Sequence, residues 1–185
     1  TFYKHGVSYP LAGRDELVRL MPQLRRRYPS YAAFGASRVE DIFAASDLRK
    51  AKLLEAHLFA SAVALNNGDG TFQLQPLPVE AQVAPVHAAL AEDFDGDGHV
   101  DLLLAGNFYG VPPVLGRYDA SYGLLLRGTA GGGGDGHFAA VDLEQSGVVI
   151  DGQVRHLGLV KQADGSRLII VARNNDKLQI LRPLR

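Results

Sequence analysis

Residues 93–101 read Asp-Phe-Asp-Gly-Asp-Gly-His-Val-Asp, and an apolar run that ends at Ala105 follows them. Carboxylates this close together repel one another unless a positive charge lies among them. Ca²⁺ takes about six to eight oxygen ligands, and carboxylates at alternating positions of a tight loop can converge on one ion. Gly98 can adopt the turn conformation that a side chain would obstruct. The stretch therefore predicts a calcium loop between two β-strands, the second of them buried.

The loop departs from the EF-hand pattern. An EF-hand requires a bidentate Glu at the twelfth loop position, and Leu104 stands there when Asp93 is counted first. No helical pattern flanks the loop, and the closing acid arrives earlier, at Asp101. The alternative interpretation is a solvated acidic turn. The predicted calcium ligands are side-chain oxygens of Asp93, Asp95, Asp97 and Asp101 and the backbone carbonyl of His99.

The composition excludes several classes of function. The chain has 185 residues, 46% hydrophobic and 21% charged, with a net charge of −1, which argues against a nucleic-acid partner held by general electrostatics. It contains no cysteine, so disulfides, zinc–thiolate sites and thiol catalysis are excluded. No apolar stretch is long enough to predict a membrane span. The opening residues 1–4 predict the interior of a longer protein, so a missing signal peptide says nothing about secretion.

The first part of the chain has a helical pattern. A short strand is predicted at 1–4, and apolar residues at helical spacing follow from Leu17 to Leu24. Pro22 interrupts this pattern, which predicts two short helices. Ser37 and Glu40 form a capping box that predicts a helix over about 38–44, and Ser46 is expected to cap a further turn. Residues 1–55 are therefore interpreted as a partial strand plus an α-helical insertion.

The periodicity then changes to that of strands, with no helix expected after residue 75. Turn-forming Gly, Asn and Asp clusters separate the apolar segments, and the cluster at 66–70 predicts a hairpin. The predicted strands cover 56–65, 71–74, 86–92, 100–106, 121–127, 137–141, 154–160, 167–173 and 177–182.

Internal repetition organises these strands. Gly68–Phe72 (Gly-Asp-Gly-Thr-Phe) recurs 66 positions later at Gly134–Phe138, and Asp97-Gly98 before an apolar strand recurs 67 positions later at Asp164-Gly165. Each unit would hold four antiparallel strands, which is the blade of a β-propeller. We predict a mainly β partial propeller of about two and a half units. Its segments are the end of a preceding blade (56–85), a calcium-loop blade (86–142) and a degenerate final blade (143–185).

The loop and the strand after it resemble the calcium loop of FG-GAP/VCBS repeats, which occur in integrin α-subunit propellers and bacterial surface proteins. The runs 103–110, 116–123 and 171–176 are similar to the C-terminal part of Bacteroidetes VCBS-repeat proteins, which often carry an ASPIC/UnbV domain. The resemblance implies a secreted, outer-membrane-associated or cell-surface propeller. It implies calcium at Asp93, Asp95, Asp97, the His99 carbonyl and Asp101.

A second candidate site is the long segment 107–122. Exposed aromatic residues beside Arg and Asp can bind sugars or proteins. The alternative is a loop held onto its own blade by aromatic packing and a contact between Arg117 and Asp119. The candidate surface residues are Asn107, Tyr109, Arg117, Tyr118, Asp119 and Tyr122.

The expected function is non-enzymatic scaffolding or protein recognition at a bacterial cell surface. The expected partners are a protein or glycan and the remainder of the protein's own propeller. Two alternatives remain open. One is a glycan-binding propeller module, and the other is part of a polysaccharide-active enzyme in which Arg117 or Tyr118 would act beside the metal.

Overall fold

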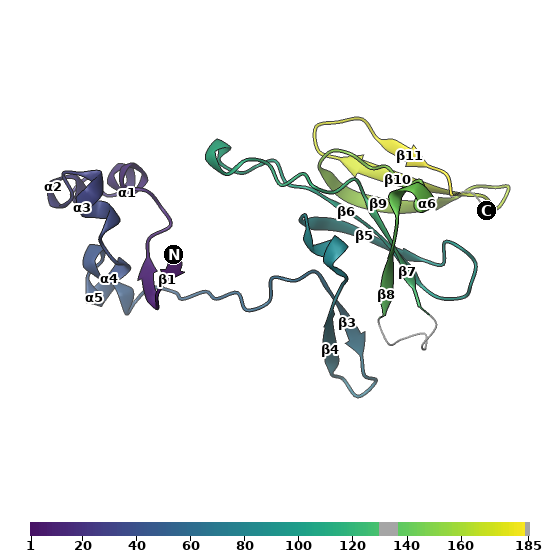
Figure 1. Ribbon diagram of the computed structural model, residues 1–185, viewed down its shortest axis with the longest axis horizontal. Coiled ribbons are helices and arrows are strands. Elements are labelled where there is room, and N and C mark those ends of the chain that lie inside the picture. The colour runs from purple at the N-terminus through teal and green to yellow at the C-terminus, as the bar shows by residue number, and fades with distance from the viewer. Residues whose placement is uncertain (130–136, 184–185) are drawn as a thin grey trace. The chain divides into compact units, whose positions relative to one another are not determined.

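The computed structural model describes residues 1–129 and 137–183, and the chain divides into two compact units, residues 1–57 and 58–185. Most regular structure is β, and the described strands form four small antiparallel sheets (Figure 1). The mainly β fold class is therefore confirmed. These strands do not close into a barrel or a ring.

The first unit begins with a hairpin and continues as short helices around a small apolar core. Leu17 and Val18 pack there with Leu24, Tyr28 and Ile42. The break at Pro22 separates the first two helices, as predicted. The hairpin's second strand and the third helix were not predicted. The elements are β1 (Phe2–Lys4), β2 (Val7–Tyr9), α1 (Arg14–Leu20), α2 (Leu24–Arg27), α3 (Tyr31–Gly35), α4 (Val39–Ile42) and α5 (Ala45–Leu48).

The predicted helix caps in this unit are wrong. The residue that caps α4 is Arg38, whose N–H donates to the Asp41 carboxylate at 2.9 Å. Ser37 instead donates its hydroxyl to the carbonyl of Ala33, so it completes the end of α3. Ser46 lies inside α5, whose N-cap is Ala44. α4 and α5 begin close to where they were expected, but their N-cap residues differ from the predicted ones.

The second unit holds the remaining sheets. The strand order is β3-β4 in one sheet, β5-β6-β7-β8 in the next and β11-β10-β9 in the last. The predicted strands are confirmed with small shifts, except that the first is shorter than 56–65. The elements are β3 (Ala62–Asn66), β4 (Phe72–Pro76), η1 (Val79–Gln82), β5 (Val86–Glu92), β6 (Asp101–Gly106), η2 (Pro113–Leu115), β7 (Leu124–Gly128), β8 (Phe138–Val141), α6 (Leu143–Ser146), β9 (Val154–Lys161), β10 (Arg167–Arg173) and β11 (Gln179–Leu181).

Helical turns after residue 75 correct the expectation of none. α6 is a single turn after β8, and Gly147 ends it in the left-handed conformation at φ 60°. η1 and η2 are short 3₁₀ turns that follow Pro78 and Pro112. Each of these turns is too short for the apolar periodicity on which a helix prediction depends. The repeated Gly134-Asp135-Gly136 lies outside the described residues.

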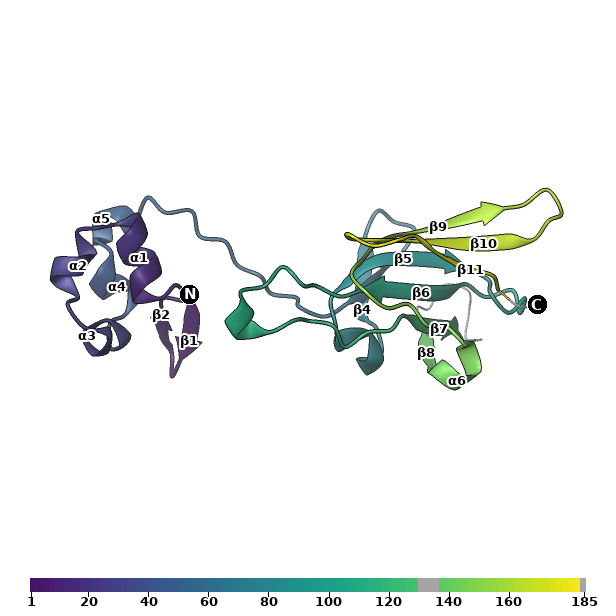
Figure 2. The same ribbon diagram turned by 90° about the horizontal axis from the view of Figure 1, so that it is seen from above.

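β6 is buried on both faces of its sheet, and consecutive side chains of the strand point to opposite faces. Leu103 and Ala105 of β6 pack with Leu157 and Val171 of the β9–β11 sheet. Leu104 instead packs on the other side, in the cluster that contains Leu77, Ala81 and Leu126. Figure 2 shows β9 and β10 lying beside β5 and β6. Two-sided burial explains why β6 is an unbroken apolar run.

Candidate metal centre at the β5–β6 loop

The loop of residues 93–100 joins β5 to β6, and three carboxylates come together in it and at the first residue of β6. Asp93, Asp95 and Asp101 each offer one oxygen, and these oxygens lie within 4.8 Å of one another. Calcium–oxygen distances of about 2.3–2.6 Å allow ligands on opposite sides of one ion to be about 4.6–5.2 Å apart. The donor set is all oxygen, as a hard cation requires. The three side chains could therefore hold a single metal ion.

The Asp93 side chain shapes the loop by accepting hydrogen bonds from backbone N–H groups. Its two carboxylate oxygens accept hydrogen bonds from the N–H groups of Gly96 at 2.6 Å and Gly98 at 3.0 Å. Both glycines have positive φ, 81° and 85°, a region that side-chain-bearing residues rarely adopt. The Gly residues within the acidic motif thus let the chain fold back around the first aspartate.

Asp101 connects the loop to the rest of the sheet. Its side chain is buried, with 2% of the residue exposed. One oxygen accepts from Phe94 N at 3.0 Å and the other from Gly128 N in β7 at 2.9 Å. The sequence predicted Asp101 as a metal ligand, but its contact with β7 depends on strand pairing and could not be predicted.

Asp97 stands apart from the three clustered carboxylates. The Asp97 carboxylate accepts a hydrogen bond from His99 N at 2.8 Å, and Asp97 does not belong to the group whose oxygens converge. The structure therefore brings together three of the four aspartates predicted as ligands. Asp97 closes the turn that leads into β6.

Two arginines that sequence reasoning missed lie beside the loop. Arg127 Nε is 2.8 Å from a carboxylate oxygen of Asp95. Arg167 of β10 contacts Glu92 at 2.8 Å and donates to the backbone carbonyl of Asp93 at 3.3 Å. Leu102 pairs with Leu126 across β6 and β7, so Arg127 falls opposite the start of β6. Only this register reveals the contact, because Arg127 is distant in sequence from the loop.

A cavity of ≈ 730 Å³ adjoins the loop. Asp95, Asp101, Arg127 and Arg167 contribute its polar lining, and Leu103 and Ile169 are among its apolar residues. The cavity thus lies between the β5–β8 and β9–β11 sheets. The loop 93–100 lies at the junction of the two sheets, and each sheet contributes a charged side chain near it.

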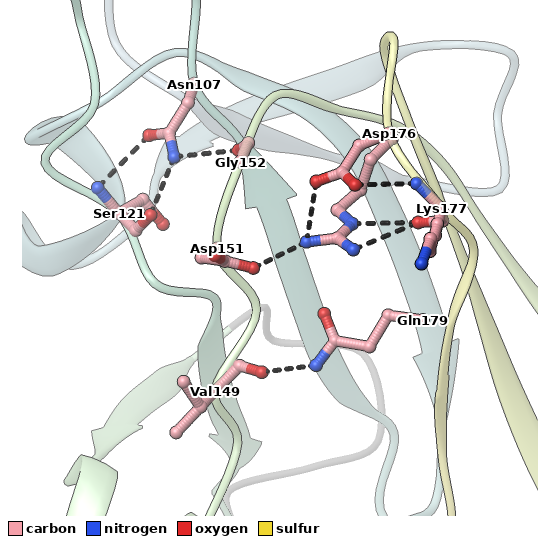
Figure 3. A network of polar contacts seen from close by, with 9 residues as sticks. Asn107, Ser121, Val149, Asp151, Gly152, Asp176, Lys177 and Gln179 are labelled. Carbon is pink, nitrogen blue, oxygen red and sulfur yellow. Dashed lines mark hydrogen bonds and ion pairs between the residues drawn. The ribbon is translucent and has the colours of Figure 1, made fainter.

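Asn107 is buried, unlike the other candidates in the segment 107–122. Only 2% of it is exposed, and its amide donates to the carbonyls of Ser121 at 2.7 Å and Gly152 at 3.0 Å (Figure 3). Its side-chain oxygen accepts from Ser121 N at 3.1 Å. It therefore holds the two ends of the β6–β7 loop together and ties them to the connection before β9, instead of lying on a partner surface.

The same network continues into the β10–β11 hairpin. Arg173 contacts the carboxylates of Asp151 at 2.6 Å and Asp176 at 3.1 Å. Gln179 of β11 donates to the carbonyl of Val149 at 2.7 Å (Figure 3). The connection 149–153 is thus fixed to both of the sheets that it joins.

The remaining candidates form an extended hairpin loop. Phe108 and Tyr118 pair through their backbones, and the Arg117 guanidinium lies 4.9 Å from the centre of the Tyr109 ring. The ion pairs of the described residues include none between Arg117 and Asp119. Aromatic and cation–π contacts therefore order the loop. Tyr118 and Tyr122 are 48% and 58% exposed.

Comparisons of the chain with protein-family models, with curated proteins and with solved structures find no match. In the described part of the chain, none of the helices has the length and apolarity that crossing a membrane requires.

Proposed function

We propose that residues 58–185 are a calcium-stabilised segment of a β-propeller of the FG-GAP/VCBS type. The observation that carries this proposal is the convergence of the Asp93, Asp95 and Asp101 carboxylates within 4.8 Å at a hairpin loop. Calcium would supply the positive charge that offsets their mutual repulsion. Asp93 and Asp101 would hold the loop's backbone, as their hydrogen bonds indicate.

The arrangement of the sheets supports the propeller part of the proposal. β5, β6, β7 and β8 follow one another in both sequence and space, as the strands of one blade do. The β9–β11 sheet packs on one face of this sheet through Leu157 and Val171. The β3–β4 hairpin and η1 contribute Val63, Leu77 and Ala81 to the opposite face. Stacked sheets of this kind are typical of neighbouring blades.

The segment's role would be non-enzymatic scaffolding or protein recognition at a bacterial cell surface. Figures 1 and 2 show the β6–β7 loop extending beyond the end of its sheet. Tyr118 and Tyr122 are exposed on this loop, while Asn107 and the Arg117–Tyr109 contact hold it in place. A rigid loop with exposed tyrosines suits binding of a protein, or of a glycan as the alternative, because little conformational entropy is lost on binding.

The test is a thermal melt of the full chain in calcium and in EDTA, for wild type and Asp95→Ala. An ion that binds only the folded state at about one hundred times its Kd adds about 2.7 kcal/mol to the free energy of unfolding. For a unit of this size we expect a melting temperature about 10 °C higher in calcium. Asp95→Ala should lose this increment.

The matched control is Asp164→Ala, which removes an aspartate from the corresponding turn between β9 and β10. It should keep the full calcium increment, because Asp164 lies outside the carboxylate cluster. Equal melting temperatures of the wild type in calcium and in EDTA would contradict the proposed function.

A further inference from the structure

Arg127 makes the closest contact between a positively charged side chain and the three clustered carboxylates. Its Nε is 2.8 Å from Asp95 Oδ2, and the other oxygen of Asp95 accepts from Asp97 N at 3.2 Å. The arginine side chain is 52% exposed and the aspartate 33%. Both oxygens of Asp95 are thus engaged by groups of the chain itself.

Arg167 has a different relation to the loop. It pairs with Glu92 and with the backbone carbonyl of Asp93, and it contacts none of the three clustered carboxylates. Among the described ion pairs, the one with Arg127 is therefore the pair that an ion at the cluster would disturb. An ion that used Asp95 Oδ2 would either displace the guanidinium or bind next to a like charge.

We propose that Arg127 is a built-in counter-ion that competes with calcium for Asp95 and so lowers the calcium affinity of the loop. The inference rests on the proposed function, because it concerns the same site. Without metal, the guanidinium reduces repulsion among the aspartates and keeps Asp95 turned toward the cluster. With metal, that contact is exchanged for one with the ion. The loop thus alternates between two cations, one of which belongs to the chain.

The test is a calorimetric titration of the full metal-free chain with calcium chloride, for wild type, Arg127→Gln and Arg155→Gln. Arg155→Gln removes the same charge from an exposed position on β9, at the end of that strand away from the turn leading to Arg167. An exposed ion pair changes an equilibrium constant by about two- to fivefold. We expect Arg127→Gln to bind calcium tighter by about that factor and Arg155→Gln to match the wild type.

A second measurement separates competition from a general charge effect. In EDTA, Arg127→Gln should melt at a lower temperature than Arg155→Gln, because only the first variant leaves the carboxylates without their counter-ion. If Arg127→Gln folds poorly, Arg127→Lys serves instead and should bind calcium more tightly than the wild type, because its ammonium group cannot reproduce the contact of Nε with Asp95 Oδ2.

An affinity of Arg127→Gln equal to or weaker than that of the wild type would overturn the inference while the proposed function stands. If the wild type takes up no calcium, the proposed function fails and the competition fails with it. The two failures are therefore distinguishable in one series of titrations.

Discussion

The hairpins β5–β6 and β9–β10 correspond at an offset of 67 residues in the sequence, but their turns differ. Residues 93–100 contain the carboxylates of Asp93, Asp95 and Asp97, whereas residues 162–166 contain only that of Asp164. In the second turn Gln162 N donates to Ser166 O at 2.8 Å, and the Ser166 hydroxyl contacts Gln162 and Asp164 at 2.7 and 2.6 Å. Strand pairing in this fold therefore does not require an acidic loop.

The strand that follows each turn differs in the same way. Asp101 begins β6 buried and bonded to Phe94 and Gly128, while the corresponding residue of β10, Leu168, pairs with Val160. The first hairpin concentrates negative charge where two sheets meet, and without a cation the repulsion among these charges lowers its stability. The second hairpin carries no such cost. The proposed ion-binding role of the acids therefore concerns the first hairpin alone.

The largest effect is expected from an alanine in β6. A Cβ at Gly106 would overlap the backbone carbonyl oxygen of Pro85, so β5 and β6 would have to separate. We expect Gly106→Ala to lower the free energy of unfolding by about 3 kcal/mol. Urea denaturation measures this effect. Gly158→Ala in β9 is the control, because nothing lies within 4 Å of its added Cβ. Equal losses in both variants would show that the two hairpins are packed alike.

A smaller effect is expected at the start of β6. Asp101→Asn keeps the shape of the side chain, but one amide oxygen cannot accept both the Phe94 and the Gly128 hydrogen bonds, and the NH₂ group faces a backbone donor. We expect a loss of about 2 kcal/mol in urea denaturation, in EDTA as well as in calcium. Asp164→Asn should change stability little, because its exposed side chain can still accept from Ser166 N. An Asp101→Asn variant as stable as the wild type would show that this carboxylate has no structural role.

The smallest effect is expected in the second turn. The hydrogen bond from the Ser166 hydroxyl is the main cause that lowers the pKa of Asp164. Because the pKa in the folded state lies below the unfolded value, this contribution is present above a pH of about 4 and is lost as the pH falls through the folded-state pKa. Ser166→Ala should raise the Asp164 pKa, which an NMR titration of the carboxyl carbon measures. An unchanged pKa would contradict the hydrogen bond between the Ser166 hydroxyl and the Asp164 carboxylate.

Much of the second unit could be predicted because its signals are local. The strands 86–92 and 167–173 match the predicted bounds, since each is an apolar run bounded by Pro, Gly, Asn or Asp residues that form turns. The helix break at Pro22 is equally local. The cap at Arg38 was missed because Ser37 bonds back to the preceding helix, and α6 was missed because one turn has no periodicity.

The candidate site was predictable only in part. Asp93, Asp95 and Asp101 converge as their spacing indicates, but Asp97 turns to His99 N. Asn107 was expected on a surface and is buried, because its partners Ser121 and Gly152 come from two other segments of the chain. Arg127 was not considered at all. The differences at Asn107 and Arg127 arise from contacts between residues that are distant in sequence, whereas the Asp97 contact is local and two conformations of that turn satisfy the same spacing equally.

Chemical spacing within a few residues was enough to locate the acidic loop, the strands around it and their repeat, because backbone geometry places neighbours in sequence near one another in space. The register of β6 against β7 and the packing of one sheet on the next decided which charges face the loop. Arg127 and Arg167 reach it only through these pairings. Long-range packing therefore determines the charge around the aspartates.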